Sequence, residues 1–292
     1  MKFKDYGIAY LFLTPWFLGL LIFSLFPLVA SLYLSFTSYD MFNTPVWTGL
    51  QNYYHIFTDD TFYTSLKVTF KYVFLSVPLE LIAALALALL LSNSMSRAVN
   101  LYRGLYYIPS LIGASVSIAL LWRQIFGAEG LLNQLLWLFD IQTSSWIASP
   151  ETALFTIVLL KVWQFGSPMI IFLAGLKQIP KELYEACAMD GSGRIGRFLH
   201  ITLPLITPFV LFNLIMQIIA TFQAFTPAYI VSGGSGGPVK STLFYTLYLY
   251  QQGFQNYQMG FASAMAWLLM VIIGLFSLVT FWTSKRWVHY ME

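Results

Sequence analysis

Residues 66–91 read LKVTFKYVFLSVPLELIAALALALLL, an apolar run long enough to cross a bilayer as one helix. The whole chain is similarly apolar, because 58% of its 292 residues are hydrophobic and only 9% are charged. Soluble domains carry about 25% charged residues, so these charges cannot cover a soluble globule. The formal net charge of +3 comes without a basic block, which removes the basis for nucleic-acid binding. The composition therefore indicates a membrane protein.

Five further apolar runs have the length of about 20 residues that a membrane-spanning helix needs. They lie at residues 8–36, 102–126, 152–176, 204–231 and 259–283. We therefore predict an all-α membrane protein with six transmembrane helices, folded as a single transmembrane domain over residues 1–292. The first run is too long for a cleavable signal peptide, so we expect it to remain as an anchor.

The positions of Lys and Arg predict the orientation of these helices. Six spans put both termini on one side of the membrane, and that side would carry ten of the fifteen basic residues. The opposite side would carry four, and Lys161 lies within a span. We therefore expect both termini in the cytoplasm, with residues 177–203 as a cytoplasmic loop between the fourth and fifth spans.

The residue types that catalysis needs form no recognisable pattern in this sequence. The three histidines are not paired at a metal-ligand spacing, and Cys187 is the single cysteine. The stretch GGSGGPVKST at 233–242 ends like a phosphate-binding loop, but Val239 stands where that loop requires Gly. We therefore expect no enzyme, no catalytic residues, no metal site and no cofactor bound by this chain.

The cytoplasmic loop carries the most informative motif, IPKELYEACAMDGSGRIGRFLHITLPLITP, at residues 179–208. Its spacing predicts a short helix over 181–189, a turn at Asp190 and Gly191 with Gly191 at positive φ, and a second helical piece over 193–201. An amphipathic helix at the lipid headgroups is the alternative. The small residues in the middle of the first helix disfavour it, because lipid insertion favours large apolar side chains.

This loop resembles the EAA loop of importer-type ABC permeases. The residues that carry the resemblance are Glu185, Ala186, Cys187, Asp190, Gly191, Phe198, Ile201, Leu203, Pro204 and Pro208. The resemblance implies a cytoplasmic coupling helix that docks into a cleft of an ATPase subunit through Glu185, Ala186, Cys187, Asp190 and Gly191. Residues 232–264 are also similar to sugar permeases, in the form typical of the maltose-type first permease subunit.

The resemblance implies the permease subunit of an ATP-driven carbohydrate importer that works by alternating access. Its implied partners are a second permease subunit, a cytoplasmic ATPase dimer that binds ATP and Mg, and an extracellular or periplasmic solute-binding protein. The implied location is the inner or plasma membrane of a bacterium or archaeon. The alternative is a self-sufficient secondary transporter or channel that uses Glu80 and Lys161 for ion coupling.

Polar residues within spans cost free energy to place in the membrane, so they are candidates for a substrate pathway. Asn213, Gln217 and Thr221 are four residues apart and share one face of the fifth span, where they could line a cavity or bond between helices. Lys161, Gln164 and Phe165 share a face of the fourth span. Lys161 could pair with Glu80 or with an acid of a partner subunit, or it could bind a carboxylate of an acidic glycan in the pathway.

Overall fold

The computed structural model describes residues 2–92, 99–113, 115–141 and 145–289, with side chains from residue 10 onward. These residues are almost entirely helical, and the strands among them form one antiparallel pair, β1 (Thr37–Ser38) with β2 (Val46–Trp47). The contacts divide the chain into two compact units. The first unit is Met1–Asp60 with Leu249–Val271, and the second is Thr61–Tyr248 with Ile272–Glu292.

The first unit begins with a long apolar helix. It is built from α1 (Lys2–Leu20), a π-helical turn (Leu21–Leu25) and α2 (Phe26–Ser35). The β1–β2 hairpin, α3 (Gln51–Thr58), a second π-helical turn (Gln251–Gln255) and the first half of α16 (Met259–Ser284) complete the unit. The Asn52 amide fastens the end of α2 by donating to the carbonyls of Ser35 and Thr37, each at 2.9 Å.

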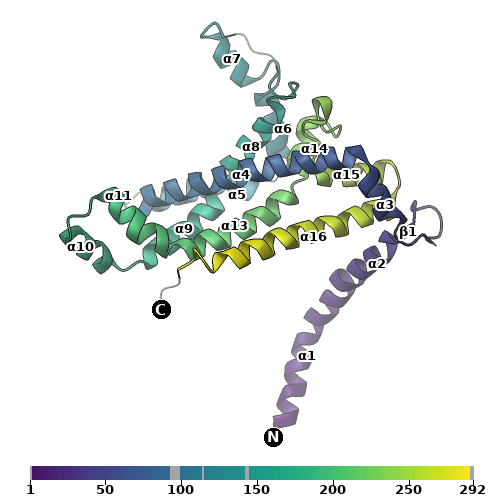
Figure 1. Cartoon of the computed structure of the whole chain (residues 1–292), viewed down its shortest axis with the longest axis horizontal. Helices are drawn as coiled ribbons and strands as arrows, with labels where there is room; N and C mark the ends of the chain where they lie inside the picture. The colour runs from purple at the N-terminus through teal and green to yellow at the C-terminus, as the bar shows by residue number, and fades with distance from the viewer. Residues whose placement is uncertain (1, 93–98, 114, 142–144, 290–292) are drawn as a thin grey trace. The chain divides into compact units, whose positions relative to one another are not determined.

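The second unit holds the remaining helices, which Figure 1 labels in chain order. They are α4 (Asp60–Ser92), α5 (Val99–Ile112), α6 (Val116–Ile125), α7 (Leu131–Trp137), α8 (Ala153–Trp163), α9 (Gly166–Gln178), α10 (Lys181–Met189), α11 (Arg194–Arg197), a π-helical turn (Phe198–Thr202), α12 (Leu203–Leu205), α13 (Thr207–Phe222), α14 (Thr226–Ser232), a 3-10 turn (Pro238–Lys240) and α15 (Tyr245–Tyr250). The last part of α16 belongs to this unit as well.

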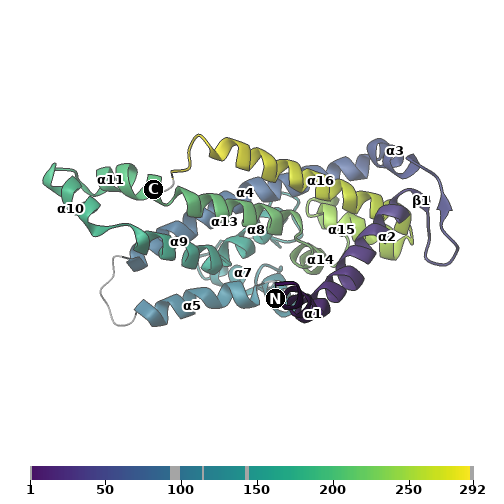
Figure 2. The ribbon, with the colours of Figure 1, turned by 90° about the horizontal axis from the view of Figure 1, so that it is seen from below.

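Helix α4 is the central element of the second unit, and Figures 1 and 2 show it alongside α13. Its buried residues recur every three or four positions, as expected for one face of a helix. Phe70 of α4 packs against Phe222 of α13 and Phe276 of α16, with ring centroids 5.5 Å apart in both pairs. The fully buried Ala84 and Ala88 leave no bulk on this face, so neighbouring backbones can approach closely.

Within the described residues, three helices are long and apolar enough to cross a membrane unbroken. They are Tyr10–Ser35, Asp60–Ser92 and Met259–Ser284, which match the predicted first, second and sixth spans. Three bent helix pairs raise the number of possible spans to six.

The third, fourth and fifth predicted spans correspond to bent helix pairs and not to single straight helices. The bend is 97° between α5 and α6, 42° between α8 and α9, and 63° where the helical stretch that ends at Leu205 meets α13. A further break separates α13 from α14. Local chemistry explains three of these four breaks. Ser115 caps α6 by accepting from the Ile118 amide, and Pro208 and Pro227 lie in the first turns of α13 and α14, where proline starts a helix.

Candidate functional site

A buried ion pair lies at the centre of the second unit. The Lys161 ammonium of α8 is 3.2 Å from both carboxylate oxygens of Glu80 on α4, and it donates to the Gln217 side-chain carbonyl of α13 at 2.7 Å. The Glu80 side chain is 1% exposed and that of Lys161 is 15% exposed. The three side chains therefore tie three helices together. Of the interpretations given to Lys161 from sequence, this geometry favours the ion pair with Glu80.

The polar stripe of α13 lies in packed protein in this conformation. Asn213 and Thr221 are buried, and Gln217 between them is half-buried. The Asn213 amide donates to the Pro168 carbonyl at 3.3 Å, but its own oxygen and the Thr221 hydroxyl have no hydrogen-bond partner among the described residues. A buried polar atom without a partner costs about 1–3 kcal/mol. The stripe thus holds acceptors that are unsatisfied here.

One serine hydroxyl bonds the backbone on both sides of the break between α8 and α9. The Ser110 hydroxyl of α5 donates to the Gln164 carbonyl and accepts from the Ser167 amide, each at 2.8 Å. Gly166 is needed at this point, because an added Cβ would lie 2.4 Å from the Tyr106 carbonyl oxygen. The Phe165 ring lies 6.1 Å from the Tyr106 ring. Sequence reasoning missed Ser110 and Gly166; a glycine inside a predicted span was the available signal.

The loop between the fourth and fifth predicted spans folds as its motif predicts. Helix α10 covers Lys181–Met189, and Gly191 has a φ of +76°, so both expectations are confirmed. The second helical piece is present as α11 followed by a π-helical turn up to Thr202. Glu185, Ala186, Asp190 and Gly191 are exposed, whereas Cys187 is half-buried. Figures 1 and 2 show α10 and α11 at one end of the second unit.

The surface of this loop lacks a partner within the described chain. None of the nine residues of α10 is buried, and the apolar side chains of Met189 and Ile195 are 88% and 77% exposed. Apolar side chains exposed to this degree on a short rigid helix pair are typical of a protein contact. Beside them is a pocket of about 830 Å³ with four basic residues, Lys177, Lys181, Arg194 and Arg197, in its lining.

A second hydroxyl contact links this loop to the transmembrane helices. The Tyr184 hydroxyl of α10 lies 2.9 Å from the Thr202 hydroxyl, directly before α12. Thr202 is buried, so the contact anchors α10 at the point where the chain enters the membrane helices. Neither residue was singled out from the sequence.

Three comparisons relate this arrangement to known proteins. The family model described as "Binding-protein-dependent transport system inner membrane component" matches residues 61–287. The probable ABC transporter permease protein YesP of Bacillus subtilis (strain 168) is 52% identical over 289 residues, which cover 98% of this chain and 93% of the relative. The arabinooligosaccharides transport system permease protein AraP of the same organism is 34% identical over 275 residues, which cover 93% and 86%.

A solved structure shares the fold. It is the crystal structure of a bacterial alginate ABC transporter in complex with an alginate pentasaccharide-bound periplasmic protein. The TM-score is 0.82 at 21% sequence identity, with 97% of this chain and 96% of that chain covered. The predicted fold class, an all-α membrane protein with the fold of a six-helix ABC importer permease, is thereby confirmed.

Proposed function

Because the chain belongs to the family of binding-protein-dependent transport system inner membrane components, as a permease subunit of an ABC importer, we propose that its substrate is a sugar or oligosaccharide. The relative that transports arabinooligosaccharides supports this substrate class, since it is 34% identical over nearly the whole chain. The family is one of transport permeases and not of enzymes. A self-sufficient secondary transporter is disfavoured for the same reason.

The exposed face of α10 and α11 is the observation that carries the proposed mechanism. An ATPase subunit that binds ATP and Mg would dock on Glu185, Ala186, Cys187, Asp190 and Gly191. Its closure would move α10, and the Tyr184–Thr202 contact would pass that movement to α12 and α13. The four basic residues beside α10 support a cytoplasmic location of this end, because cytoplasmic loops are enriched in Lys and Arg. Both termini would then also be cytoplasmic.

The remaining partners follow from the same assembly. A six-helix subunit needs a second permease to enclose a pathway, and a solute-binding protein would deliver the sugar on the outer side. The alginate transporter of similar fold was crystallised with such a periplasmic protein. The location proposed is the inner or plasma membrane of a bacterium or archaeon.

The pathway proposal concerns α8, α9 and α13. Asn213 and Thr221 hold unsatisfied acceptors in this conformation, and a state that separates the helices would offer them to sugar hydroxyls or water. Gln164 and Phe165 lie at the break next to Lys161, where a bend can change with little loss of helix bonding. These residues together with Gln217 would line the pathway when it opens.

Reconstitution of the complete importer tests the proposal. Proteoliposomes with both permeases, the ATPase and the binding protein should accumulate a labelled oligosaccharide only when ATP and Mg are supplied. The permease alone should show no uptake under a membrane potential. Uptake by the permease alone would contradict the importer proposal, and ATP-driven uptake of a different solute class would contradict the carbohydrate proposal.

A further inference from the structure

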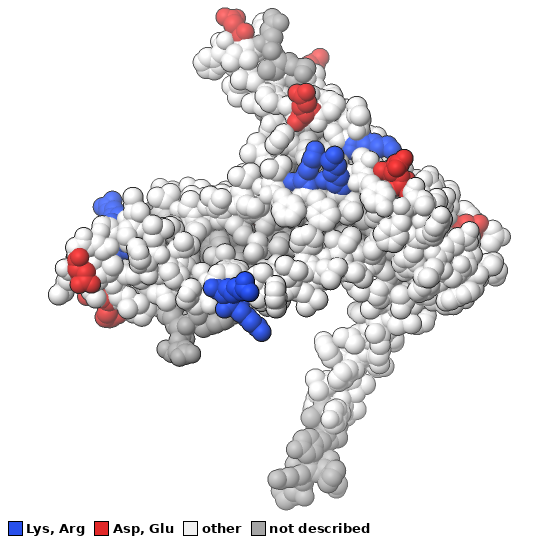
Figure 3. All heavy atoms as spheres, in the orientation of Figure 1, with Lys and Arg blue, Asp and Glu red and all other residues white. Residues whose placement is uncertain are grey.

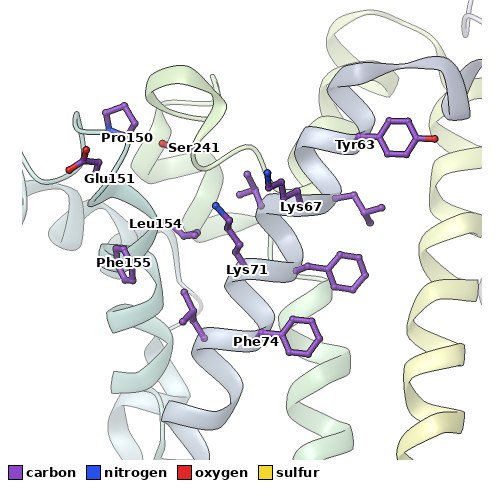
Figure 4. Close-up of a pocket in the computed structure, with 13 residues that line it drawn as sticks. Tyr63, Lys67, Lys71, Phe74, Pro150, Glu151, Leu154, Phe155 and Ser241 are labelled. Carbon is purple, nitrogen blue, oxygen red and sulfur yellow. The ribbon is translucent and has the colours of Figure 1, made fainter.

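An open groove of about 1080 Å³ lies in the second unit, between the first half of α4, the start of α8 and the turn before α15 (Figure 4). We refer to it as the α4 groove. Its lining is mostly apolar and includes aromatic rings of α4 and α8, two lysines of α4 and a serine of the turn: Tyr63, Phe74, Phe155, Lys67, Lys71 and Ser241. Its volume slightly exceeds the range of about 300–1,000 Å³ for small-molecule pockets, so it has room for an oligosaccharide.

The two lysines give the groove its charge. Lys67 and Lys71 are four residues apart on α4, are both exposed, and point to the same side of the helix in Figure 4. Neither forms an ion pair with a described residue. Like charges at this spacing repel each other, so an anion bound between them relieves the repulsion. Figure 3 shows Lys and Arg side chains gathered over this part of α4.

The one acid in the groove lining does not neutralise this pair. Glu151 stands on the opposite wall, and in Figure 4 its carboxylate points away from both ammonium groups. The groove therefore presents two positive charges to its contents.

The aromatic rings favour a sugar as the occupant. Tyr63, Phe74 and Phe155 are exposed in the groove, and Phe74 is 61% exposed. Ligand sites combine such apolar and aromatic walls with a few placed polar groups. The C–H faces of a pyranose ring pack on aromatic rings, while its hydroxyls need hydrogen-bond partners.

The turn before Ser241 is strained. Val239 and Lys240 in this turn have φ values of +51° and +58°. Positive φ is rare for a β-branched residue, and strain of this kind gathers at functional sites. The Ser241 side-chain oxygen is itself buried, so a ligand in the groove does not reach it in this conformation.

We propose that the α4 groove binds an acidic oligosaccharide, with a uronate carboxylate between Lys67 and Lys71 and a sugar ring against the exposed aromatic side chains. The proposal rests on the carbohydrate import proposed above and adds the charge of the substrate. Lys71 lies nine residues before Glu80, which places it about 14 Å along α4 from the buried ion pair. With both termini in the cytoplasm, the groove lies on the outer side, where substrate enters.

Uptake of a matched pair of substrates tests the proposal. The complete importer carrying Lys67→Gln and Lys71→Gln is compared with the wild type, using a galacturonate trisaccharide and its carboxyl-reduced neutral counterpart. Exposed ion pairs contribute about 0.2–1 kcal/mol each, so KM for the acidic trisaccharide should rise roughly two- to thirtyfold. KM for the neutral trisaccharide should change less than twofold. Raising the salt concentration should slow acidic uptake by the wild type more than by the variant.

Two control variants separate this outcome from others. Lys67→Arg with Lys71→Arg keeps both charges and should retain the preference for the acidic trisaccharide. Lys285→Gln removes one exposed charge at the end of α16 and should leave both KM values unchanged. Equal KM changes for the two sugars, loss of assembly with the second permease, or a changed dependence on anionic lipid without a change in sugar preference would each overturn the proposal.

This assay gives different results if the groove proposal is wrong and if the importer proposal is wrong. If the wild type takes up the neutral trisaccharide and rejects the acidic one, the groove proposal is wrong and carbohydrate import stands. If neither of these sugars nor any other carbohydrate is taken up with ATP, the proposed function itself is wrong.

Discussion

The buried pair of Glu80 and Lys161 makes a quantitative prediction. Replacing Lys161 by Met leaves the Glu80 carboxylate, which is 1% exposed, without its counterion. Breaking a buried ion pair from one side costs about 3–5 kcal/mol, because the remaining charge stays buried without compensation. The Gln217 carbonyl also loses the donor that lies 2.7 Å away. We expect Lys161→Met to destabilise the protein by about 3–5 kcal/mol.

The opposite replacement is expected to cost less. Glu80→Gln leaves a Lys161 side chain that is 15% exposed and still bound to Gln217, so its ammonium group can stay partly hydrated. The double variant Glu80→Gln with Lys161→Met removes both charges. Replacing a buried pair by neutral groups is often close to neutral in stability, so we expect the double variant to lie within about 2 kcal/mol of the wild type.

Thermal unfolding of the purified protein in detergent measures this cycle. A change of 1 kcal/mol shifts Tm by about 2–4 °C in proteins of 150–250 residues, so Lys161→Met should lower Tm by about 6 °C or more. Much of that loss should return in the double variant. A double variant as unstable as Lys161→Met, or a Lys161→Met protein as stable as the wild type, would show that the two charges are not coupled.

Three further changes probe the break between α8 and α9 and the loop that carries α10 and α11. Gly166→Ala should lower Tm by a few degrees, because its Cβ would meet the Tyr106 backbone, whereas Gly104→Ala, which meets nothing within 4 Å, should not. Tyr184→Phe removes the hydroxyl link from α10 and should lower sugar transported per ATP hydrolysed roughly two- to fivefold without preventing ATPase binding; an unchanged ratio would refute the link. Glu185→Lys with Ala186→Trp should uncouple ATP hydrolysis from transport in proteoliposomes, and full coupling would contradict docking at α10.

Composition and periodicity were sufficient for the membrane class and for the three long apolar helices, Tyr10–Ser35, Asp60–Ser92 and Met259–Ser284. Apolar length is a local property, so residues 66–91 could be recognised without knowledge of their neighbours. The bends could not be located in this way, since a proline or glycine within a span is compatible with a straight helix when neighbouring groups satisfy the backbone. The break at Gly166 depends on Ser110, which is 56 residues earlier in the chain.

The loop that carries α10 and α11 was predictable because its signals are local. A turn at Asp190 and Gly191 and helices on either side follow from neighbouring residues, whereas the Tyr184–Thr202 contact depends on tertiary folding. The α13 stripe was found from its spacing, but its burial was not. Helical spacing tells which residues share a face and not what covers that face. The roles proposed for these residues in transport stay predictions.

The two sites that hold lysine differ in a way that bears on substrate charge. Lys161 is already bound by Glu80 and Gln217, so a carboxylate that approached it would also meet the Glu80 carboxylate and gain little net attraction. Lys67 and Lys71 have no such neighbour among the described residues. Selection for an acidic substrate is therefore expected at the α4 groove, before the substrate reaches the level of Glu80. In this arrangement Glu80 and Lys161 hold α4, α8 and α13 together, while Lys67 and Lys71 recognise the negative charge of the substrate.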